Sequence, residues 1–302
     1  MKEWADDEPY IIAHTSGSTG TPKEIRLLKS DMRISARATN AFFGLGPKFK
    51  AACPLSVDYI AGKMMAVRAL EGQYTLTELP VSNDITLPDD DSVYDLMPVV
   101  PSQLPSLLQK PYAKKIRNLL IGGASPAKDI LEQIIATGYN AYISYGMTET
   151  CSHVALRKAA EDVYKAMPGI HFCVDERDCL VIEAPHFSFG RLVTNDVVEL
   201  LSDTAFRWHG RADNVINSAG LKLQCEELEK LYEPYLNGKE YYVVGRPSSE
   251  WGTAVAIVVE GSVDKELLLE KLRAALPHRL CPKIVETVDS LPRTPNGKVK
   301  RI

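Results

Sequence analysis

The order of strand-like and helix-like segments is the feature that most restricts the fold of this chain. In the first two thirds, short apolar runs end at glycine and are followed by segments with apolar residues at helical spacing. One example runs from a strand at Ile116–Ile121 through two glycines to a helix at Lys128–Thr137, and the next strand, Ala141–Tyr145, ends at Gly146. Strand, glycine turn and helix in alternation predict a mostly parallel sheet with helices on its faces.

Two further helices are expected before this region. Ser30 is placed to cap a helix that runs to about Phe43, and Tyr59–Leu70 carries apolar residues at helical spacing. The segment Phe172–Leu201 is different, since proline and glycine break it into short β-rich runs. We expect a small antiparallel sheet or barrel there.

The last third of the chain predicts a compact α+β unit of its own. Its expected elements are a glutamate-rich amphipathic helix at Leu223–Tyr235, strands at Tyr241–Val244 and Ala254–Val259, a helix capped by Asp264 that runs to Leu276, and a strand at Lys283–Val288. The fold class is therefore α/β. A large domain, residues 1–212, has a mostly parallel sheet flanked by helices and a small β-rich subdomain, and a smaller α+β domain follows at residues 213–302.

Composition and charge exclude several classes of protein. Hydrophobic residues make up 45% of the 302 residues and charged residues 25%, which is typical of a globular chain that buries a core. Acidic side chains outnumber basic ones by 39 to 35, so the net charge of −4 provides no large basic footprint for nucleic acid. No apolar stretch is long enough to cross a bilayer, and the acidic N-terminus lacks a signal-peptide core.

The six cysteines are scattered and form no CxxC pair. They predict buried free thiols in a reducing cytosol. We therefore expect a cytoplasmic protein that acts on small molecules, with no nucleic-acid partner and no membrane insertion.

A loop rich in glycine and hydroxyl side chains follows the first apolar run, Tyr10–Ala13. It consists of Thr15, Ser16, Gly17, Ser18, Thr19, Gly20, Thr21, Pro22 and Lys23. The glycines allow the backbone to turn tightly and direct its N–H groups inward, while the hydroxyls add donors and the lysine adds a positive charge. These groups favour polyphosphate binding, although no GxxxxGK[ST] motif is present and a flexible glycine–serine linker has a similar composition.

A second cluster lies where the strand Ala141–Tyr145 ends. It brings together the ring of Tyr145, a turn at Gly146, the hydroxyl of Thr148 and the carboxylate of Glu149. A carboxylate beside phosphates is a suitable ligand for Mg²⁺, which prefers oxygen donors. The alternative interpretation is a glycine turn whose next residues only start a helix.

Three further signals follow in order along the chain. They are Thr194-Asn195-Asp196 between two β-like runs, the junction Gly210–Asp213 with Ser218–Lys222, and the turn-rich segment Pro292–Lys298. Each has an ordinary structural explanation, such as a closing turn or a solvated basic tail. The five signals in this order, however, resemble the adenylate-forming superfamily, which includes acyl-CoA synthetases and the adenylation domains of peptide synthetases, over nearly the whole chain.

The resemblance implies roles for individual residues. In the ATP site, the loop residues given above would bind the phosphates, and Gly122, Gly123 and Ala124 would line the adenine and acyl pockets. Tyr145 would stack on adenine with Gly146 beside it, and Thr148 would bind the α-phosphate. Glu149 would hold Mg²⁺, and Asp196 would bind the ribose hydroxyls with Arg211 nearby. Asp213 corresponds to the hinge of a mobile C-terminal domain, and Lys298 to the lysine that enters the site for adenylation. The resemblance also implies ATP, Mg²⁺ and CoA.

Residues 58–69 and 145–157 are similar to short members of the o-succinylbenzoate–CoA ligase family of menaquinone biosynthesis. The implied reaction converts o-succinylbenzoate, ATP and CoA to o-succinylbenzoyl-CoA, AMP and diphosphate. Because this acid keeps a second, aromatic carboxylate, its pocket needs a polar or cationic anchor. The expected pocket residues are Tyr59, Lys63, Arg68 and Ser152 for the acid and Gly220 and Lys222 for CoA. For Lys63 and Arg68, a solvated helix face is the alternative.

The sequence departs from the superfamily pattern at two points. Family members usually carry a subdomain before the phosphate loop, whereas here the loop begins at Thr15. We therefore expect an exposed sheet edge, which a partner copy in a homo-oligomer could cover. Thr194-Asn195-Asp196 replaces the usual Thr-Gly-Asp but keeps the aspartate. Other functions also remain open: a different acyl- or aryl-CoA ligase, an amino-acid-activating enzyme in which Asp58 meets the substrate ammonium, or a nucleotide-binding protein without catalysis.

Overall fold

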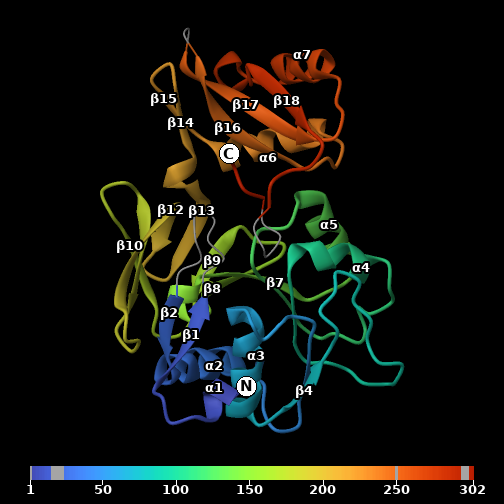
Figure 1. Ribbon diagram of the computed structural model, residues 1–302, viewed down its shortest axis with the longest axis vertical. Coiled ribbons are helices and arrows are strands. Elements are labelled where there is room, and N and C mark those ends of the chain that lie inside the picture. Colours follow the sequence, from blue (N-terminus) through green and yellow to red (C-terminus); the bar gives the residue numbers. More distant parts are fainter. Residues whose placement is uncertain (1, 15–23, 249–250, 294–298) are drawn as a thin grey trace. The chain divides into compact units, whose positions relative to one another are not determined.

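The computed structural model describes residues 2–14, 24–248, 251–293 and 299–302 (Figure 1). These residues form two compact units. The first contains the chain up to Cys173 together with Ile182–Leu192 and Leu200–Arg207. The second contains Val174–Val181, Val193–Glu199 and Trp208–Ile302.

Three helices of the first unit, α2, α3 and α5, lie close to their predicted positions, and the shorter helices were not predicted. The helices of this unit are α1 (Lys2–Ala5), α2 (Lys29–Phe43), α3 (Ile60–Gly72), α4 (Leu104–Leu108) and α5 (Lys128–Ala136), with the short 3₁₀ helices η1 (Pro101–Gln103) and η2 (Thr148–Thr150). The predicted cap at Ser30 is wrong. The helix follows the preceding strand directly, so its N-cap is Leu28, which makes no side-chain capping bond.

The strands of the described residues form one large sheet and several small ones. The large sheet contains β5 (Met97–Val99), β6 (Leu119–Ile121), β7 (Ala141–Gly146), β8 (His153–Lys158), β9 (Val163–Ala166), β10 (His171–Val174), β11 (Cys179–Ala184), β12 (Gly190–Ser202) and β13 (Ala205–Arg211). Its strand order is β10-β11-β12-β13-β9-β8-β7-β6-β5. The pairs β1 (Tyr10–His14) with β2 (Glu24–Leu28) and β3 (Lys50–Cys53) with β4 (Thr75–Glu78) form separate two-stranded sheets.

The pairing within the large sheet is mixed. Strands β5, β6 and β7 are parallel, whereas β7 with β8, β8 with β9, and β9 with β13 are antiparallel. The β-rich segment Phe172–Leu201 supplies strands of this same sheet. The predicted α/β class is thus confirmed, with the parallel strands at β5–β7, where glycine turns separate strand from helix.

From Ala212 onward, the second unit is a small α+β assembly. Its elements are η3 (Ala212–Asn214), β14 (Val215–Ser218), β15 (Leu221–Gln224), α6 (Cys225–Tyr232), η4 (Glu233–Tyr235), β16 (Tyr241–Ser248), β17 (Gly252–Glu260), α7 (Lys265–Ala275), η5 (His278–Leu280) and β18 (Ile284–Val288). Strand β17 pairs antiparallel with β16 and parallel with β18. The predicted Asp264 cap is confirmed, because its carboxylate accepts a bond of 3.1 Å from the Leu267 N–H.

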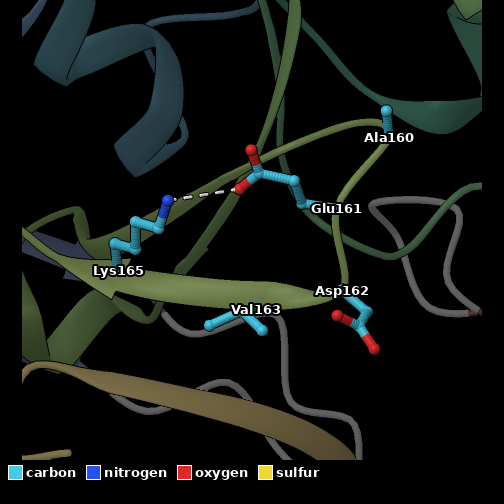
Figure 2. Close-up of a pocket in the computed structure, with 5 residues that line it drawn as sticks. All are labelled: Ala160, Glu161, Asp162, Val163 and Lys165. Atoms are coloured by element: carbon cyan, nitrogen blue, oxygen red, sulfur yellow. Dashed lines mark ion pairs between the residues drawn. The ribbon is translucent and has the colours of Figure 1, made fainter.

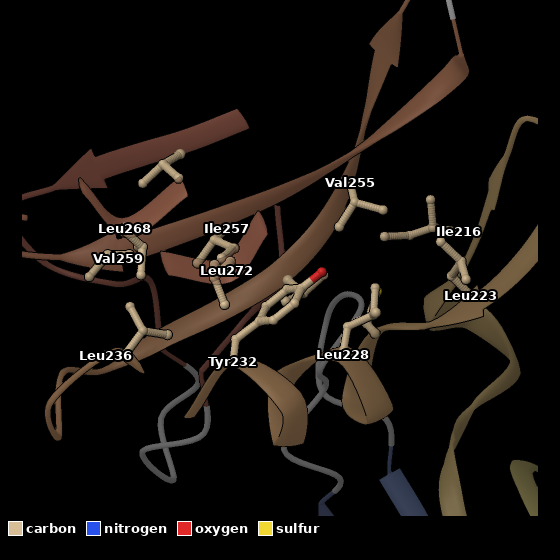
Figure 3. Close-up of a cluster of buried hydrophobic side chains, with 13 residues drawn as sticks. Ile216, Leu223, Leu228, Tyr232, Leu236, Val255, Ile257, Val259, Leu268 and Leu272 are labelled. Carbon is tan, nitrogen blue, oxygen red and sulfur yellow. The ribbon is translucent and has the colours of Figure 1, made fainter. Parts of the chain in front are cut away.

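A continuous apolar core holds this second unit together (Figure 3). Tyr232 on α6 lies at its centre, with Ile257 of β17 and Leu272 of α7 beside it, and all three are fully buried. The phenol of Tyr232 satisfies its polar end by donating to the Leu280 carbonyl. Removal of this apolar surface from water is the main force that stabilises the unit.

The thiols and helices agree with the expectations drawn from composition. The six cysteines are free, five of them are buried, and only Cys173 is half-exposed. Among the helices of the described residues, none combines the length and the apolar character needed to span a membrane.

Candidate active site

The carboxyl ends of the parallel strands β5, β6 and β7 are joined by close polar contacts. The Ser144 hydroxyl donates to the Ile121 carbonyl at 3.0 Å, and the Gly122 N–H donates to the Val99 carbonyl at 2.9 Å. A Cβ on Gly122 would approach Ser144 Oγ to 3.1 Å, and Gly123 has a φ of +88°. The turn that continues to Ala124 therefore presents its backbone at the edge of the sheet where α/β proteins bind ligands.

The turn after β7 is closed by one buried hydroxyl. Thr150 Oγ1 accepts a bond of 3.0 Å from the Met147 N–H and donates to the Ser152 carbonyl at 2.7 Å. Gly146 is required here, because a Cβ at that position would lie 2.3 Å from the Ser152 carbonyl oxygen. The turn thereby fixes the backbone between Gly146 and Ser152.

Thr148 and Glu149 lie on this closed turn, as the sequence predicted. Thr148 is half-buried and Glu149 is exposed, and neither side chain has a hydrogen bond or ion pair within the described part of the chain. A carboxylate next to a hydroxyl, both without partners among the described residues, fits Mg²⁺ that shares phosphate ligands, because this ion takes few ligands from the protein. Across the described ranges no three His, Cys, Asp or Glu residues gather as a closed metal site.

Tyr145 belongs to an aromatic cluster in the first unit. Its ring meets Phe206 edge-on with 5.0 Å between ring centroids and lies 5.7 Å from the ring of Tyr164. The guanidinium of Arg157 covers Tyr164 at 5.3 Å. The Tyr145 ring is therefore held by neighbours while remaining half-exposed, as a platform for a stacked base requires.

The predicted ribose ligand, Asp196, lies in the second unit. It is 8% exposed, and Oδ1 accepts a bond of 3.1 Å from the indole N–H of Trp208. Its own N–H donates to Thr194 Oγ1 at 3.0 Å, and that hydroxyl donates to the Leu180 carbonyl at 2.8 Å. The carboxylate is thus held in one orientation, which suits the recognition of a diol.

Arg211 and Asp213 form an ion pair of 2.7 Å at the start of η3. Asn195 Nδ2 also approaches Asp213, at 3.2 Å, and Asn195 Oδ1 accepts a bond of 3.1 Å from Arg177 Nη1. The sequence did not reveal this role for Asn195, which stands where the superfamily pattern has glycine. The residue therefore connects the predicted ribose triplet with the predicted hinge.

The loop Thr15–Lys23 and the lysine at position 298 fall outside the described residues. Their flanks are described. The loop joins the antiparallel strands β1 and β2, which pair up to His14 and Glu24. The lysine's segment lies between Arg293 and Val299, which form an antiparallel bridge.

Arg301 anchors the end of that same segment in the second unit. Its Nη2 lies 2.6 Å from Glu229 Oε2 on α6, and its Nη1 lies 3.5 Å from Glu226 Oε1. Burial opposes the charge on Arg301, but Glu229 outweighs it and raises the pKa of the guanidinium. The ion pair is therefore a fixed point three residues after Lys298.

The four residues expected around the acid differ greatly in environment. Tyr59 is exposed at the N-cap of α3, whereas Lys63 and Arg68 are buried at 8% and 2% exposure. The interpretation of a solvated helix face is therefore wrong for both charged residues. Arg68 Nη2 donates to Ser152 Oγ, which brings two predicted pocket residues from α3 and from the turn after β7 together.

The two cations of α3 differ in their partners. The Lys63 ammonium forms an ion pair of 2.9 Å with Glu3 and donates to the Ile12 carbonyl at 3.3 Å. No carboxylate of the described residues pairs with Arg68, and its Nε has no hydrogen-bond partner. Burial lowers the pKa of Arg68 to about 10. An unpaired buried guanidinium is costly, and an anion would compensate it.

More unsatisfied polar atoms surround Arg68. Buried side-chain atoms without a partner in the described ranges include the Tyr74 hydroxyl and Asn40 Oδ1, in addition to Arg68 Nε. Asn40 is adjacent, since its Nδ2 donates to the Arg68 carbonyl at 2.8 Å. Buried polar atoms without a partner are uncommon in native interiors and need an explanation. A polar ligand that binds them is one such explanation.

The residues expected to contact CoA lie on the hairpin β14–β15. Gly220 and Lys222 are exposed, and the two-residue turn Ala219-Gly220 has positive φ at both positions, 49° and 81°. The Ala219 N–H donates to the Trp251 carbonyl at 3.0 Å. This geometry is that of a tight hairpin turn, which keeps the loop short and its backbone accessible.

A separate open pocket lies at the connection from β8 to β9 and on β9 itself (Figure 2). It is lined by Ala160, Glu161, Asp162, Val163 and Lys165. Glu161 pairs with Lys165 at 3.5 Å and Asp162 with Arg207 at 2.7 Å. Since these charges are paired and no predicted site residue lines the pocket, we assign it no role.

Comparison with known proteins places this arrangement in a family. Residues 1–181 match the family described as AMP-binding enzyme, and residues 227–298 match the AMP-binding enzyme C-terminal domain. The first match alone covers more than half of the chain. The chain belongs to the AMP-binding enzyme family. It is thus an acid–CoA ligase of the AMP-forming type by family, and the predicted superfamily is confirmed.

Individual relatives share the fold and most of the chain. A solved acyl-CoA synthetase (AMP-forming)/AMP-acid ligase II-like protein from Dyadobacter fermentans is 32% identical, with 99% of this chain and 90% of that chain covered and a TM-score of 0.66. A 2-succinylbenzoate–CoA ligase of Listeria monocytogenes is 26% identical over all of this chain and 70% of its own. The o-succinylbenzoate coenzyme A synthetase of Bacillus subtilis, in complex with ATP and magnesium ion, is 20% identical, covers 96% of this chain and 68% of its own, and superposes with a TM-score of 0.82.

Proposed function

We propose that this AMP-binding enzyme is an o-succinylbenzoate–CoA ligase of menaquinone biosynthesis. The main support is the buried guanidinium of Arg68, which has no carboxylate partner among the described residues. This guanidinium contacts Ser152, which lies on the same turn as Thr148 and Glu149. A substrate with a second carboxylate supplies the missing negative charge. The name of the Listeria relative supports the same acid.

Two displacements make up the proposed reaction. In the first, the succinyl carboxylate of the acid attacks the α-phosphorus of ATP, and diphosphate leaves. In the second, the CoA thiol loses its proton and its sulfur attacks the carbonyl of the acyl-adenylate, and AMP leaves. Both steps bring anions together, so positioning and cationic stabilisation are the main contributions of the protein.

The residues of this chain divide these tasks. Thr148 donates its hydroxyl to an α-phosphate oxygen, Asp196 accepts from the ribose hydroxyls, and Lys298 neutralises charge at the α-phosphate. Glu149 would hold Mg²⁺, which when bound neutralises phosphate oxygens and orients diphosphate as leaving group. Arg68 binds the aromatic carboxylate and so leaves the succinyl carboxylate as the reacting group.

A hinge at Asp213 would allow one active site to carry out both adenylation and thioester formation. Adenylation needs Lys298, whereas thioester formation needs the pantetheine chain to arrive along the turn of Gly220 and Lys222. A small domain, residues 213–302, that turns about Asp213 satisfies both needs. Residues 1–212 then form the adenylation domain, and the free thiols fit the expected cytoplasmic location.

The test compares acids that differ only in the second carboxylate. AMP release is measured with ATP, Mg²⁺ and CoA, using o-succinylbenzoate, 4-oxo-4-phenylbutanoate (which lacks the ring carboxylate) and a panel of amino acids. We expect o-succinylbenzoate to be preferred, and Arg68→Met to remove most of that preference. Lys63→Met is the matched control on the same helix, since the Lys63 ammonium is already paired with Glu3.

Other results would assign another function. Preference for an amino acid would identify an amino-acid-activating enzyme, although Asp58 is exposed and accepts a bond from Ser56 in the turn before α3. Preference for the acid without the ring carboxylate would indicate another acyl- or aryl-CoA ligase. Nucleotide binding without AMP release for any acid would identify a non-catalytic binder.

A further inference from the structure

A chain of hydrogen bonds runs from Arg68 into helix α2. Arg68 Nη2 donates to Ser152 Oγ, and that oxygen lies 3.3 Å from His153 Nδ1. His153 Nε2 lies 3.1 Å from Thr39 Oγ1, which in turn donates to the Ser35 carbonyl at 3.0 Å. All of these side chains except that of Ser152, which is half-exposed, are buried. The chain thus joins α3, the turn after β7, the first residue of β8, and α2.

The hydroxyl at the far end sets the direction of every bond in this chain. Thr39 has one hydroxyl proton, and the bond to the Ser35 carbonyl uses it. Thr39 Oγ1 therefore accepts from His153, which requires the proton on Nε2. Nδ1 is then an acceptor and takes the proton of the Ser152 hydroxyl, whose oxygen accepts from Arg68. In the other tautomer, the Ser35 carbonyl and the Ser152 proton would each lose a partner.

The charge state of His153 agrees with this direction. The ring is 8% exposed, and burial together with the charge of Arg68 lowers the pKa of His153 well below its usual range. A neutral imidazole has one donor and one acceptor, which is what the chain requires. This role could not be predicted from sequence patterns, because Thr39 and His153 lie 114 positions apart.

We propose that His153 is a positioning residue of the acid-binding site. Thr39 fixes the imidazole, the imidazole orients the Ser152 hydroxyl, and that hydroxyl holds one arm of the Arg68 guanidinium. Nη1 donates to Met65 Sδ at 3.5 Å, and Nε, which has no partner among the described residues, is thereby left in a fixed orientation for the carboxylate of an aromatic dicarboxylic acid. This inference rests on the proposed function and names the residues that set its specificity.

The tautomer is tested without any substrate. The protein is labelled with ¹⁵N-histidine, and the ring resonances of its six histidines are recorded with a His153→Gln variant for assignment. We expect His153 to carry its proton on Nε2, and Thr39→Val to disturb its ring shifts. A proton on Nδ1 in the parent protein would overturn the proposal.

The effect on the substrate is tested with Thr39→Val, which keeps the shape and removes the acceptor. The KM for o-succinylbenzoate should rise roughly five- to tenfold, as expected for one lost hydrogen bond, while kcat and the KM for ATP stay unchanged. Turnover of 4-oxo-4-phenylbutanoate should not change. In an Arg68→Met background, Thr39→Val should add nothing further, because its effect passes through the guanidinium.

Thr137→Val is the matched control. Thr137 also donates its hydroxyl to the carbonyl four residues earlier, Gln133, at 2.7 Å, but it is exposed and has no hydrogen bond to a histidine of the described residues. Thermal denaturation of both variants shows whether either has lost its fold. If Thr39→Val proves unstable, Thr39→Ser, which keeps the hydroxyl, should restore both stability and KM.

The outcomes separate this inference from the proposed function. If the parent protein shows no AMP release with o-succinylbenzoate, the proposed function and the carboxylate role fail together. If the parent is active, and Thr39→Val changes both acids equally or changes kcat alone, only the positioning role of His153 is overturned.

Discussion

Nδ2 of Asn195 lies 3.2 Å from Oδ1 of Asp213, so the residue that replaces glycine in the usual triplet contacts the proposed hinge. Arg211 holds the other oxygen of the same carboxylate at 2.7 Å. The side chain at the hinge is therefore restrained from two directions. A rotation of the small domain about Asp213 must either break the contacts of Asp213 with Asn195 and Arg211 or move these residues with it.

Substitution of Asp213 by proline tests the hinge directly. Proline fixes φ and removes the N–H, so the variant should be held in one domain orientation. We expect adenylation, measured as diphosphate release, to survive while formation of the CoA thioester falls by orders of magnitude. Asn195→Gly is the control that removes a hinge contact without restricting φ, and it should retain both steps. A parallel loss of both steps in Asp213→Pro, with an unchanged melting temperature, would move the hinge elsewhere.

The lysine of the C-terminal segment should serve only the first step. Lys298→Ala should abolish adenylate formation, since the positive charge at the α-phosphate is lost, and should spare CoA transfer to a supplied acyl-adenylate. Each half-reaction is assayed separately. Lys300→Ala, two positions further on, is the control and should keep both activities. Equal loss of the two half-reactions in Lys298→Ala would refute the assignment.

Glu149→Gln should weaken the dependence on magnesium and leave the fold intact. The amide keeps the shape of the side chain but loses the charge that attracts the ion. The concentration of Mg²⁺ for half-maximal AMP release should rise, and the melting temperature should stay the same. Glu132→Gln on the exposed face of α5 is the control. If the magnesium titration of Glu149→Gln matches that of the parent, Glu149 is only part of the turn.

The ion pair of Arg301 with Glu229 should position the segment of Lys298. Arg301→Met removes a charged hydrogen bond that is worth roughly 1.5–3 kcal/mol when partly buried, so the melting temperature should fall. Adenylation should slow more than thioester formation, because the fixed point after Lys298 is lost. Arg273→Met, on the exposed side of α7, should affect neither. A uniform loss of activity would indicate a general effect on folding instead.

The buried His153 should make stability depend on pH. Its pKa in the folded protein lies well below 6.5, so below about pH 6.5 the unfolded chain binds a proton that the folded protein does not. Stability should therefore fall as the pH is lowered from 7.5 to 5, by at most about 1.4 kcal/mol per pH unit from this one group. Melting temperatures across this range provide the measurement.

His153→Gln should remove that part of the pH dependence, whatever its effect on stability at pH 7.5. The exposed His186, replaced by glutamine, is the control and should leave the pH dependence as it is in the parent. A steeper fall in His153→Gln than in the parent protein would contradict the buried neutral state.

Local patterns predicted the elements well because their causes are local. The Asp264 cap and the end of α2 at Phe43 depend on neighbouring residues, and both agree with the prediction. Ser30 failed as a cap because β2 runs directly into α2, a connection that propensity does not reveal. The predicted helix at Leu223–Tyr235 starts only at Cys225, because Leu221–Gln224 pairs with β14 instead.

Contacts between distant segments could not be predicted. Arg68 and Lys63 lie on the same helix and are both cationic. Only the packing shows that Glu3 pairs with Lys63, while Nε of Arg68 has no partner in the described part of the chain. The same holds for Asn195, whose contact with Asp213 depends on the fold of the second unit. The sequence motifs therefore predicted the type of reaction, while the fold determined which candidate side chains are left without an internal partner and can bind a ligand.

The close approach of Gly146 to the Ser152 carbonyl has a consequence for redesign. Residues proposed for the nucleotide, at Tyr145 to Glu149, and the serine proposed for the acid share one tightly closed turn, in which an added Cβ would lie 2.3 Å from that oxygen. A change to this turn that admits a new acid would also disturb adenylation. Engineering of acid preference should therefore leave Gly146 unchanged and begin at Tyr59, which is exposed at the N-cap of α3.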